Sequence, residues 1–374
     1  MPKVPAHFFL SRLTDRSGLA IKRTSDTEID DSSIIIQMRS AGVCGTDLAM
    51  LSGKRACHAE VLGHEGVGIV ISAPEPSVVA RGDRVVINPV HASKPDVVIG
   101  HSCDGIFREF FRIDPADCAA GGLLVKCPDK CPLGDSELVL AEPLASVLYS
   151  IELLLQQSGP STLLIRGSGT VGILAAKLWP LFTDSNAILV TQSESHAAWL
   201  RESIRWPPKT YVCAVSSPAH STDAPGAAML CCSRQHAEEG LGFLLNAVSP
   251  EATIDLLAGF SSGHKEPRLG CIHLDEIRWA NLRGVKASAP TVAKDSETGK
   301  TISLIGHRGT AERHILQAID LLSRRVISID DIPHRSLKLQ ELPAAVKDML
   351  SVETRLSNKW VKAIVNFSTA PMEN

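Results

Sequence analysis

The glycine-rich segment Gly167–Gly172, with the sequence G-S-G-T-V-G, constrains the fold more than any other part of the chain. It follows the predicted strand 162–165 and opens the predicted helix 172–182. That order is typical of a parallel α/β sheet that holds phosphate groups at a helix N-terminus. The first glycine permits the tight turn, the second lets backbone approach a pyrophosphate, and the third allows close helix–strand packing. We expect Gly167, Gly169, Thr170, Val171 and Gly172 to contact a dinucleotide. The alternative is a glycine-rich turn with no ligand.

The residue that distinguishes NAD from NADP is expected at the end of the next strand. An NAD site usually has an acidic residue about 20 positions after the glycines, where it binds the ribose hydroxyls. The predicted strand 187–190 places Gln192 there. A neutral side chain rejects a 2′-phosphate less strongly, and Ser193 or Ser195 could donate to one, although no arginine is expected beside it. Glu194 could instead serve as a displaced ribose ligand. The choice between NAD and NADP stays open, with NADP favoured.

Strands and helices alternate through the middle of the chain, which predicts a parallel sheet covered by helices. The first 145 or so residues are instead rich in short β-branched runs, as in a small barrel or antiparallel sheet. The last part is mixed, with an apolar helical face at 312–323 and a strand at 360–365. The predicted strands of the middle part are 162–165, 187–190, 210–215, 228–232 and 253–257, and its helices are 146–157, 172–182, 196–205 and 239–247.

Composition excludes several classes of protein. The 374 residues carry 38 Lys+Arg against 41 Asp+Glu, a formal net charge of −3, so we expect no nucleic-acid partner. The longest apolar runs, 138–155 and 163–182, contain charged residues, and the first residues do not resemble a signal peptide. None of the 10 cysteines forms a C-x-x-C pair. We expect a cytoplasmic protein with reduced thiols and no membrane partner.

A second set of residues has the chemistry of a metal site. Cys44 stands in the turn Gly42–Asp47, His64 and Glu65 follow Gly63, and Glu142 lies far downstream. Sulfur, nitrogen and oxygen donors together suit Zn²⁺, and three protein ligands with one open position are typical of a catalytic zinc. Each residue alone would be a buried thiol, a core histidine or a surface carboxylate. Together they predict a zinc centre.

These segments, with G-D-R-V at 82–85, occur in the order found in the zinc-containing medium-chain dehydrogenase/reductase family. The chain resembles that family over nearly its whole length, and most of all its sorbitol (polyol) and threonine dehydrogenase branch. The resemblance implies an α/β protein of two domains. One is a GroES-like β-rich catalytic domain formed by residues 1–146 and 291–374, and the other is a Rossmann doubly wound parallel sheet at 147–290 that binds the cofactor.

The resemblance also implies the roles of the site residues. Cys44, His64 and Glu142 would bind zinc, Glu65 would be a ligand that exchanges with water or substrate, and Thr46 would begin a proton relay. The zinc would polarise the oxygen of a secondary alcohol or ketone while hydride moves to or from nicotinamide. A small polyol-like or cyclitol-like substrate is expected, in a homodimer or homotetramer.

Three departures from the family limit this expectation. Residues 90–107 hold only Cys103, so no structural zinc is expected. Ala49 stands where the polyol branch usually has a histidine, and Gln192 replaces the acid. Arg308 could bind an anionic substrate group and Arg166 could touch the cofactor, although either could be a simple structural arginine. The alternatives are a reductase of this family without zinc and a dinucleotide-binding sensor or scaffold without catalysis.

Overall fold

The computed structural model describes residues 3–13, 18–25, 27–28, 32–217, 224–284, 288–351 and 359–367. The chain divides into two compact units. The first comprises Met1–Ala145, Glu312–Asp330 and His334–Asn374, and the second comprises Ser146–Ala311 and Asp331–Pro333. The chain passes from the first unit to the second within helix α4 (Ala141–Ser158). The boundary expected after residue 290 falls inside the second unit, which continues to Ala311.

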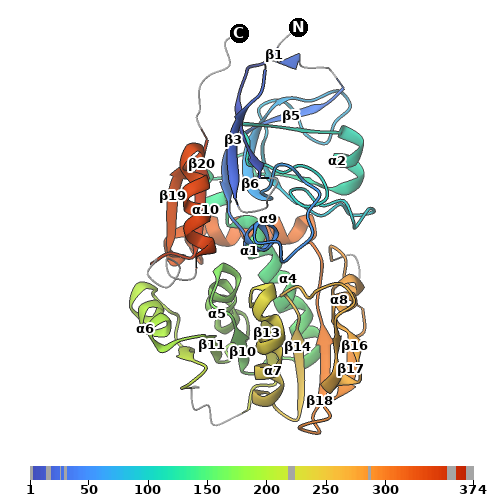
Figure 1. Cartoon of the computed structure of the whole chain (residues 1–374), viewed down its shortest axis with the longest axis vertical. Coiled ribbons are helices and arrows are strands. Elements are labelled where there is room, and N and C mark those ends of the chain that lie inside the picture. Colours follow the sequence, from blue (N-terminus) through green and yellow to red (C-terminus); the bar gives the residue numbers. More distant parts are fainter. Residues whose placement is uncertain are drawn as a thin grey trace. The chain divides into compact units, whose positions relative to one another are not determined.

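The first unit is built on a mostly antiparallel sheet with contributions from both ends of the chain (Figure 1). Its strand order is β19-β20-β5-β6-β7-β9, and β8 also pairs with β5. Strand β20 pairs antiparallel with β5, so that Ile364 lies opposite Gly42. The bounds are β5 (Ile34–Gly42), β6 (Glu65–Ser72), β7 (Arg84–Ile87), β8 (Phe110–Ile113), β9 (Leu124–Lys126), β19 (His334–Lys338) and β20 (Lys362–Asn366).

The second unit has the doubly wound sheet expected of a Rossmann fold. Its strand order is β12-β11-β10-β13-β14-β18-β17, and all neighbours are parallel except β17 and β18. Counting from β10, the parallel strands run 3-2-1-4-5-6, the arrangement that places a ligand where the order reverses. The bounds are β10 (Leu163–Arg166), β11 (Ala187–Thr191), β12 (Thr210–Ala214), β13 (Ala227–Leu230), β14 (Glu251–Asp255), β17 (Thr291–Lys294) and β18 (Thr301–Ile305).

Helices connect the parallel strands, as the alternation in the sequence predicts. They are α5 (Thr170–Thr183), α6 (Glu194–Ser203) and α7 (Ala237–Ala247) in the second unit. The segment Asp135–Ser158, which contains α4, is long and apolar enough to cross a membrane by length and composition. However, 78% of its apolar window is buried, so this segment is a core helix.

The remaining elements are short or lie at the edges of the two units. Helix α9 (Glu312–Ser323) buries Ile315, Ala318, Ile319 and Leu322 on one face, which the 3.6-residue period predicts. The other helices are α1 (Gly45–Leu51), α2 (Pro115–Gly121), α3 (Asp135–Leu138), α8 (Leu274–Ile277) and α10 (Leu342–Leu350). Three strand pairs complete the list: β1 (Lys3–Val4) with β4 (Thr27–Glu28), β2 (Phe8–Arg12) with β3 (Leu19–Arg23), and β15 (Lys265–Glu266) with β16 (Ile272–His273).

Candidate metal centre and dinucleotide turn

Cys44 caps the N-terminus of helix α1 in the first unit. Its Sγ accepts a hydrogen bond from the Thr46 backbone N–H at 3.4 Å, and the Asp47 carboxylate accepts one from the Cys44 N–H at 2.8 Å. This reciprocal capping box satisfies donors that a helix start leaves without partners. The sequence C-G-T-D therefore fixes the thiol at a rigid helix start. Thr46 lies half-buried in the first turn of the same helix.

The same aspartate holds His64 beside this thiol, and Glu65 follows His64 in the chain. Asp47 Oδ1 accepts a hydrogen bond from the Gly63 N–H at 3.3 Å and lies 3.7 Å from His64 Nδ1. Gly63 has a φ of +91°, and a Cβ there would come within 2.5 Å of the Phe107 ring, so only glycine fits. The ligand atoms of Cys44, His64 and Glu65 lie within 4.8 Å of one another. Asp47, which sequence reasoning did not single out, links the start of α1 to the segment that carries His64.

Lys362 is a second buried residue that sequence reasoning missed. Its Nζ pairs with Glu65 Oε2, and the two side chains are 1% and 4% exposed. Burial lowers the pKa of Lys362 to about 8, against the opposing effects of Cys44 and Asp47. Gly42 makes room for this lysine, because a Cβ at Gly42 would lie 2.7 Å from Lys362 Cε. The only sequence signal is a lysine inside the apolar strand predicted at 360–365.

Glu142 lies in the first turn of α4, outside the group of three ligand atoms. Burial raises the pKa of its carboxyl; His64 opposes this shift and Asp47 adds to it. The Glu142 charge also acts on the Cys44 thiol. The fourth predicted ligand is therefore close enough to interact with the other site residues, although it does not join their tight cluster.

The donor set fits a zinc ion. Burial and the Asp47 charge raise the pKa of the Cys44 thiol, and the pKa of Glu142 is raised as well. A divalent cation would favour the charged form of both groups, since an opposite charge lowers the pKa of an acid. His64 Nδ1 is buried without a hydrogen bond. A thiol, an imidazole and carboxylates are the donors that Zn²⁺ takes in proteins.

The predicted phosphate turn lies in the second unit, between β10 and α5. Gly167 has a φ of +116°, and a Cβ there would lie 2.5 Å from the backbone of Cys231. A Cβ on Gly172 would overlap the Gly167 carbonyl oxygen, whereas one on Gly169 would meet nothing within 4 Å. Helix α5 begins at Thr170 and Val171 with no side-chain cap. The turn thus presents an open helix N-terminus to which a pyrophosphate could bind.

The side chains of residues 192–194, which follow β11, are already paired with other residues of the second unit. Gln192 accepts a hydrogen bond from Arg166, so an arginine far away in the sequence stands beside it. Ser193 caps α6 by accepting from the His196 N–H at 3.3 Å. Glu194 pairs with Arg201 at 2.5 Å. Both Ser193 and Glu194 therefore already have partners within their own helix.

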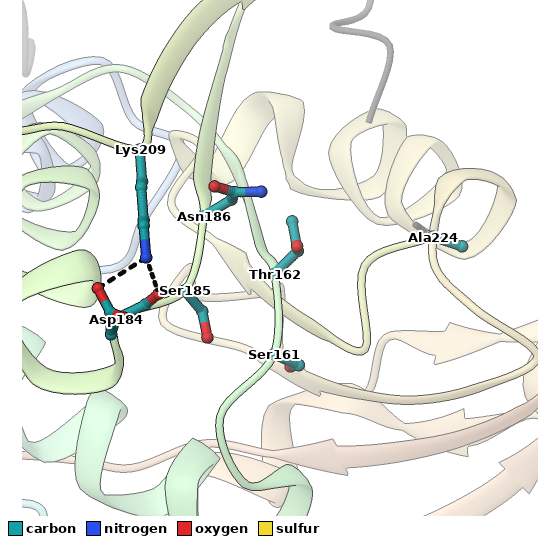
Figure 2. A pocket seen from close by; sticks show the side chains of 7 residues that line it. All are labelled: Ser161, Thr162, Asp184, Ser185, Asn186, Lys209 and Ala224. Atoms are coloured by element: carbon teal, nitrogen blue, oxygen red, sulfur yellow. Dashed lines mark hydrogen bonds and ion pairs between the residues drawn. The ribbon is translucent and has the colours of Figure 1, made fainter. Parts of the chain in front are cut away.

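Two other features lie apart from these residues. Arg308 stacks on Trp279, with its guanidinium carbon 4.0 Å from the ring centroid. Figure 2 shows a polar pocket of the second unit, in which Lys209 pairs with Asp184. Thr162, Asn186 and Lys209 each precede a parallel strand. The pocket therefore lies at the edge opposite the glycine turn, since that turn follows its strand.

Comparison with known proteins agrees with this architecture. Residues 30–122 match the family model of the alcohol dehydrogenase GroES-like domain. An uncharacterized zinc-type alcohol dehydrogenase-like protein from Haemophilus influenzae is 31% identical over 178 residues, which is 43% of this chain and 49% of that protein. The sorbitol dehydrogenase of Bombyx mori is 28% identical over 49% of this chain and 56% of its own length. The chain thus spans about half the length of the curated relatives it matches.

Solved structures match the whole fold at low sequence identity. A zinc-binding dehydrogenase from Sinorhizobium meliloti 1021, described as bound to NADP, superposes with a TM-score of 0.70 at 19% identity and covers 97% of this chain and 100% of its own. Galactitol-1-phosphate dehydrogenase from Escherichia coli gives 0.68 at 17% identity, with 96% and 99% covered.

Residues 30–122 are thus similar to the GroES-like domain of alcohol dehydrogenases, and the chain has the same fold as a zinc-binding dehydrogenase of known structure. Over about half of its length, the chain is also similar to a zinc-type alcohol dehydrogenase-like protein and to a sorbitol dehydrogenase.

Proposed function

We propose that this chain is a zinc-dependent oxidoreductase that transfers a hydride between a nicotinamide dinucleotide and a secondary alcohol or the matching ketone. The observation that carries the proposal is the approach of three ligand atoms, from Cys44, His64 and Glu65, to within 4.8 Å of one another in a buried site. A protein that only binds dinucleotides would have no need of this donor set. The reaction also requires a binding site for the dinucleotide, and the open glycine turn Gly167–Gly172 of the second unit would supply it.

In this proposal Cys44, His64 and Glu142 hold the zinc, and Glu65 exchanges with water or substrate. Zinc bound there supplies Lewis-acid polarisation of the substrate oxygen. Lys362 pairs with Glu65 and so holds this carboxylate when it is not a ligand. Asp47 keeps the Cys44 and His64 loops in place through its hydrogen bonds. The Thr46 hydroxyl, two residues after the thiol, would begin a relay in which it takes the proton of the substrate alcohol and passes its own proton on to water.

The cofactor residues act by binding and orientation. The N–H groups at the start of α5, around Thr170 and Val171, would donate to the pyrophosphate, and Gly169 leaves the space for its approach. Gln192 and Ser193 lie at the end of β11, where the adenosine ribose is expected in this fold. We further propose a small polyol-like or cyclitol-like substrate, a cytoplasmic location and a homodimer or homotetramer. The substrate class and the assembly rest on the likeness to polyol dehydrogenases, and the location rests on the charged residues within the longest apolar runs.

Metal content and turnover test the proposal together. Purified protein supplemented with zinc should retain about one zinc per chain, and should oxidise a panel of polyols and cyclitols with NAD or NADP. Cys44→Ala should lose both the metal and the activity. Cys103→Ala is the matched control because Cys103 is exposed and lies outside the ligand group.

Two results would contradict this function. Full activity of Cys44→Ala without bound metal would exclude zinc chemistry at this cluster. Wild-type protein that binds a dinucleotide but neither retains zinc nor oxidises any substrate of the panel would instead identify a non-catalytic sensor or scaffold.

A further inference from the structure

We propose that Glu239 provides the carboxylate that recognises the adenosine ribose, and that the chain therefore selects NAD over NADP. The inference rests on the proposed dinucleotide-binding function. In the usual Rossmann site the acid stands at the end of the second strand, and here Gln192 occupies that place. The structure brings a carboxylate from another element to the same point.

Three side chains converge at the carboxyl edge of the parallel sheet. Arg166 is the last residue of β10, Gln192 follows β11, and Glu239 lies in the first turn of α7, after β13. Gln192 Nε2 donates to Glu239 Oε1 at 3.3 Å, and Arg166 Nη2 lies 3.7 Å from the same oxygen. Strands β11, β10 and β13 are consecutive in the sheet, and the order reverses between β10 and β13. A dinucleotide bound by the glycine turn would lie across this point.

Arg166 and Glu239 differ in solvent exposure, and this difference determines which of them a ligand can contact. The Arg166 side chain is only 4% exposed, and its terminal nitrogens already donate to the Val190 carbonyl and to Gln192. The Glu239 side chain is 56% exposed. A ligand arriving at this edge therefore meets the carboxylate, while the guanidinium behind it orients that carboxylate. Arg166 is a positioning residue in this arrangement.

The charge balance at this edge disfavours a 2′-phosphate. The Arg166 guanidinium faces Glu239, and Arg201, in the last turn of α6, pairs with Glu194. Neither arginine offers an uncompensated positive charge to a dianionic phosphate. An exposed carboxylate accepts hydrogen bonds from two ribose hydroxyls and repels a phosphate at the same position. The neutral Gln192, which taken alone favours NADP, here bridges Arg166 and Glu239.

Binding titrations of NADH and NADPH to the full chain test this proposal without any need for turnover. We expect wild-type protein to bind NADH at least about tenfold more tightly than NADPH, as the loss of hydrogen bonds to a charged group predicts. Glu239→Gln should weaken NADH binding by about tenfold and bring the two affinities close together. Glu238→Gln is the matched control, because the neighbouring Glu238 side chain is directed to His264 at 3.2 Å. Its affinities should not change.

The variant Arg166→Met tests whether Glu239 or Arg166 recognises the adenosine ribose. If Arg166 positions Glu239, the variant should lose NADH affinity and keep its NADPH affinity. Loss of NADPH binding alone would show that the guanidinium reads a phosphate, and would overturn the proposal. Tighter wild-type binding of NADPH, or an unchanged affinity ratio in Glu239→Gln, would overturn it too, while leaving the dinucleotide-binding function intact. Failure of folded wild-type protein to bind either cofactor would overturn both.

Discussion

Asp255 is a buried carboxyl that neither the zinc cluster nor the glycine turn uses. It ends β14, has no exposed surface, and its two oxygens make no hydrogen bond of good geometry. Burial raises its pKa from 3.8 to about 6, although the Ser150 hydroxyl and the Arg278 charge oppose the shift. A carboxyl whose pKa is higher in the folded state than in the unfolded chain binds more protons when folded. Stability should therefore fall as the pH rises from about 4 to about 6.

Asp255→Asn should remove that loss. Above pH 6 the variant should be more stable than wild type by up to about 3 kcal/mol, the free energy that corresponds to the pKa shift. The gain should shrink as the pH falls and vanish near pH 4. Urea unfolding followed between pH 4 and pH 8 measures this difference. Asp129→Asn, at a side chain that is 87% exposed, is the control and should show no such trend. A gain that is equal at all pH values would show that packing, not ionisation, explains it.

Single residues also mark the limit of what the sequence could predict. Cys44, His64 and Gly167 could be proposed from the sequence because each belongs to a short local motif. Lys362 and Glu239 could not, because contacts between distant segments set their partners: Lys362 meets Glu65 across 297 positions of sequence. A lysine in an apolar strand and a glutamate in a helix start have ordinary local explanations, and only the fold brings each beside the residue with which it acts.

At the scale of single elements, the β10–turn–α5 unit makes the most specific prediction. A Cβ on Gly172 would overlap the Gly167 carbonyl oxygen, and that oxygen belongs to the backbone and cannot rotate away. Gly172→Ala should therefore push α5 away from the turn, cost about 1–3 kcal/mol of stability, and weaken NADH binding by more than about tenfold. Thermal unfolding and a fluorescence titration of NADH measure both effects.

Gly242→Ala is the matched control for this substitution. Gly242 lies within α7, and a Cβ there would meet nothing within 4 Å. Alanine is favoured over glycine in a helix, so this variant should gain up to about 1 kcal/mol and bind NADH normally. Equal effects of the two substitutions would mean that the turn does not depend on the contact between Gly172 and Gly167.

The elements themselves were largely predictable from periodicity. The apolar spacing at 312–323 reproduces α9, and the strands expected at 162–165 and 187–190 coincide with β10 and β11 within one residue. Such elements can be predicted from the local sequence because one face of each is buried, and this burial determines the spacing of the apolar residues. The pairing of β18 with β14 and of β17 with β18, which carries the second unit past residue 290, depends on contacts between distant strands. No local signal near 291–305 distinguishes a strand of one sheet from a strand of the other.

On the scale of the whole chain, each unit has its own hydrophobic core. The core of the first unit includes Met38, Val70 and Val365, and that of the second includes Leu164, Leu230 and Ile254. The proposed zinc ligands all belong to the first unit, and the glycine turn belongs to the second. A ligand stabilises the elements that it bridges, and regions that open separately respond separately. Zinc and cofactor should therefore protect different parts of the chain.

Amide hydrogen exchange after removal of the metal measures this separation. A chelator should raise exchange by more than about tenfold in α1, at the start of β6 and in β20, because the zinc would hold Cys44 and His64 together and Glu65 pairs with Lys362. Exchange in β10 to β14 should stay the same, whereas NADH should slow exchange at the turn 167–172. Cys44→Ala, already without metal, should not respond to the chelator. If the chelator raised amide exchange equally in both units, the metal would stabilise the whole chain as one cooperative folding unit.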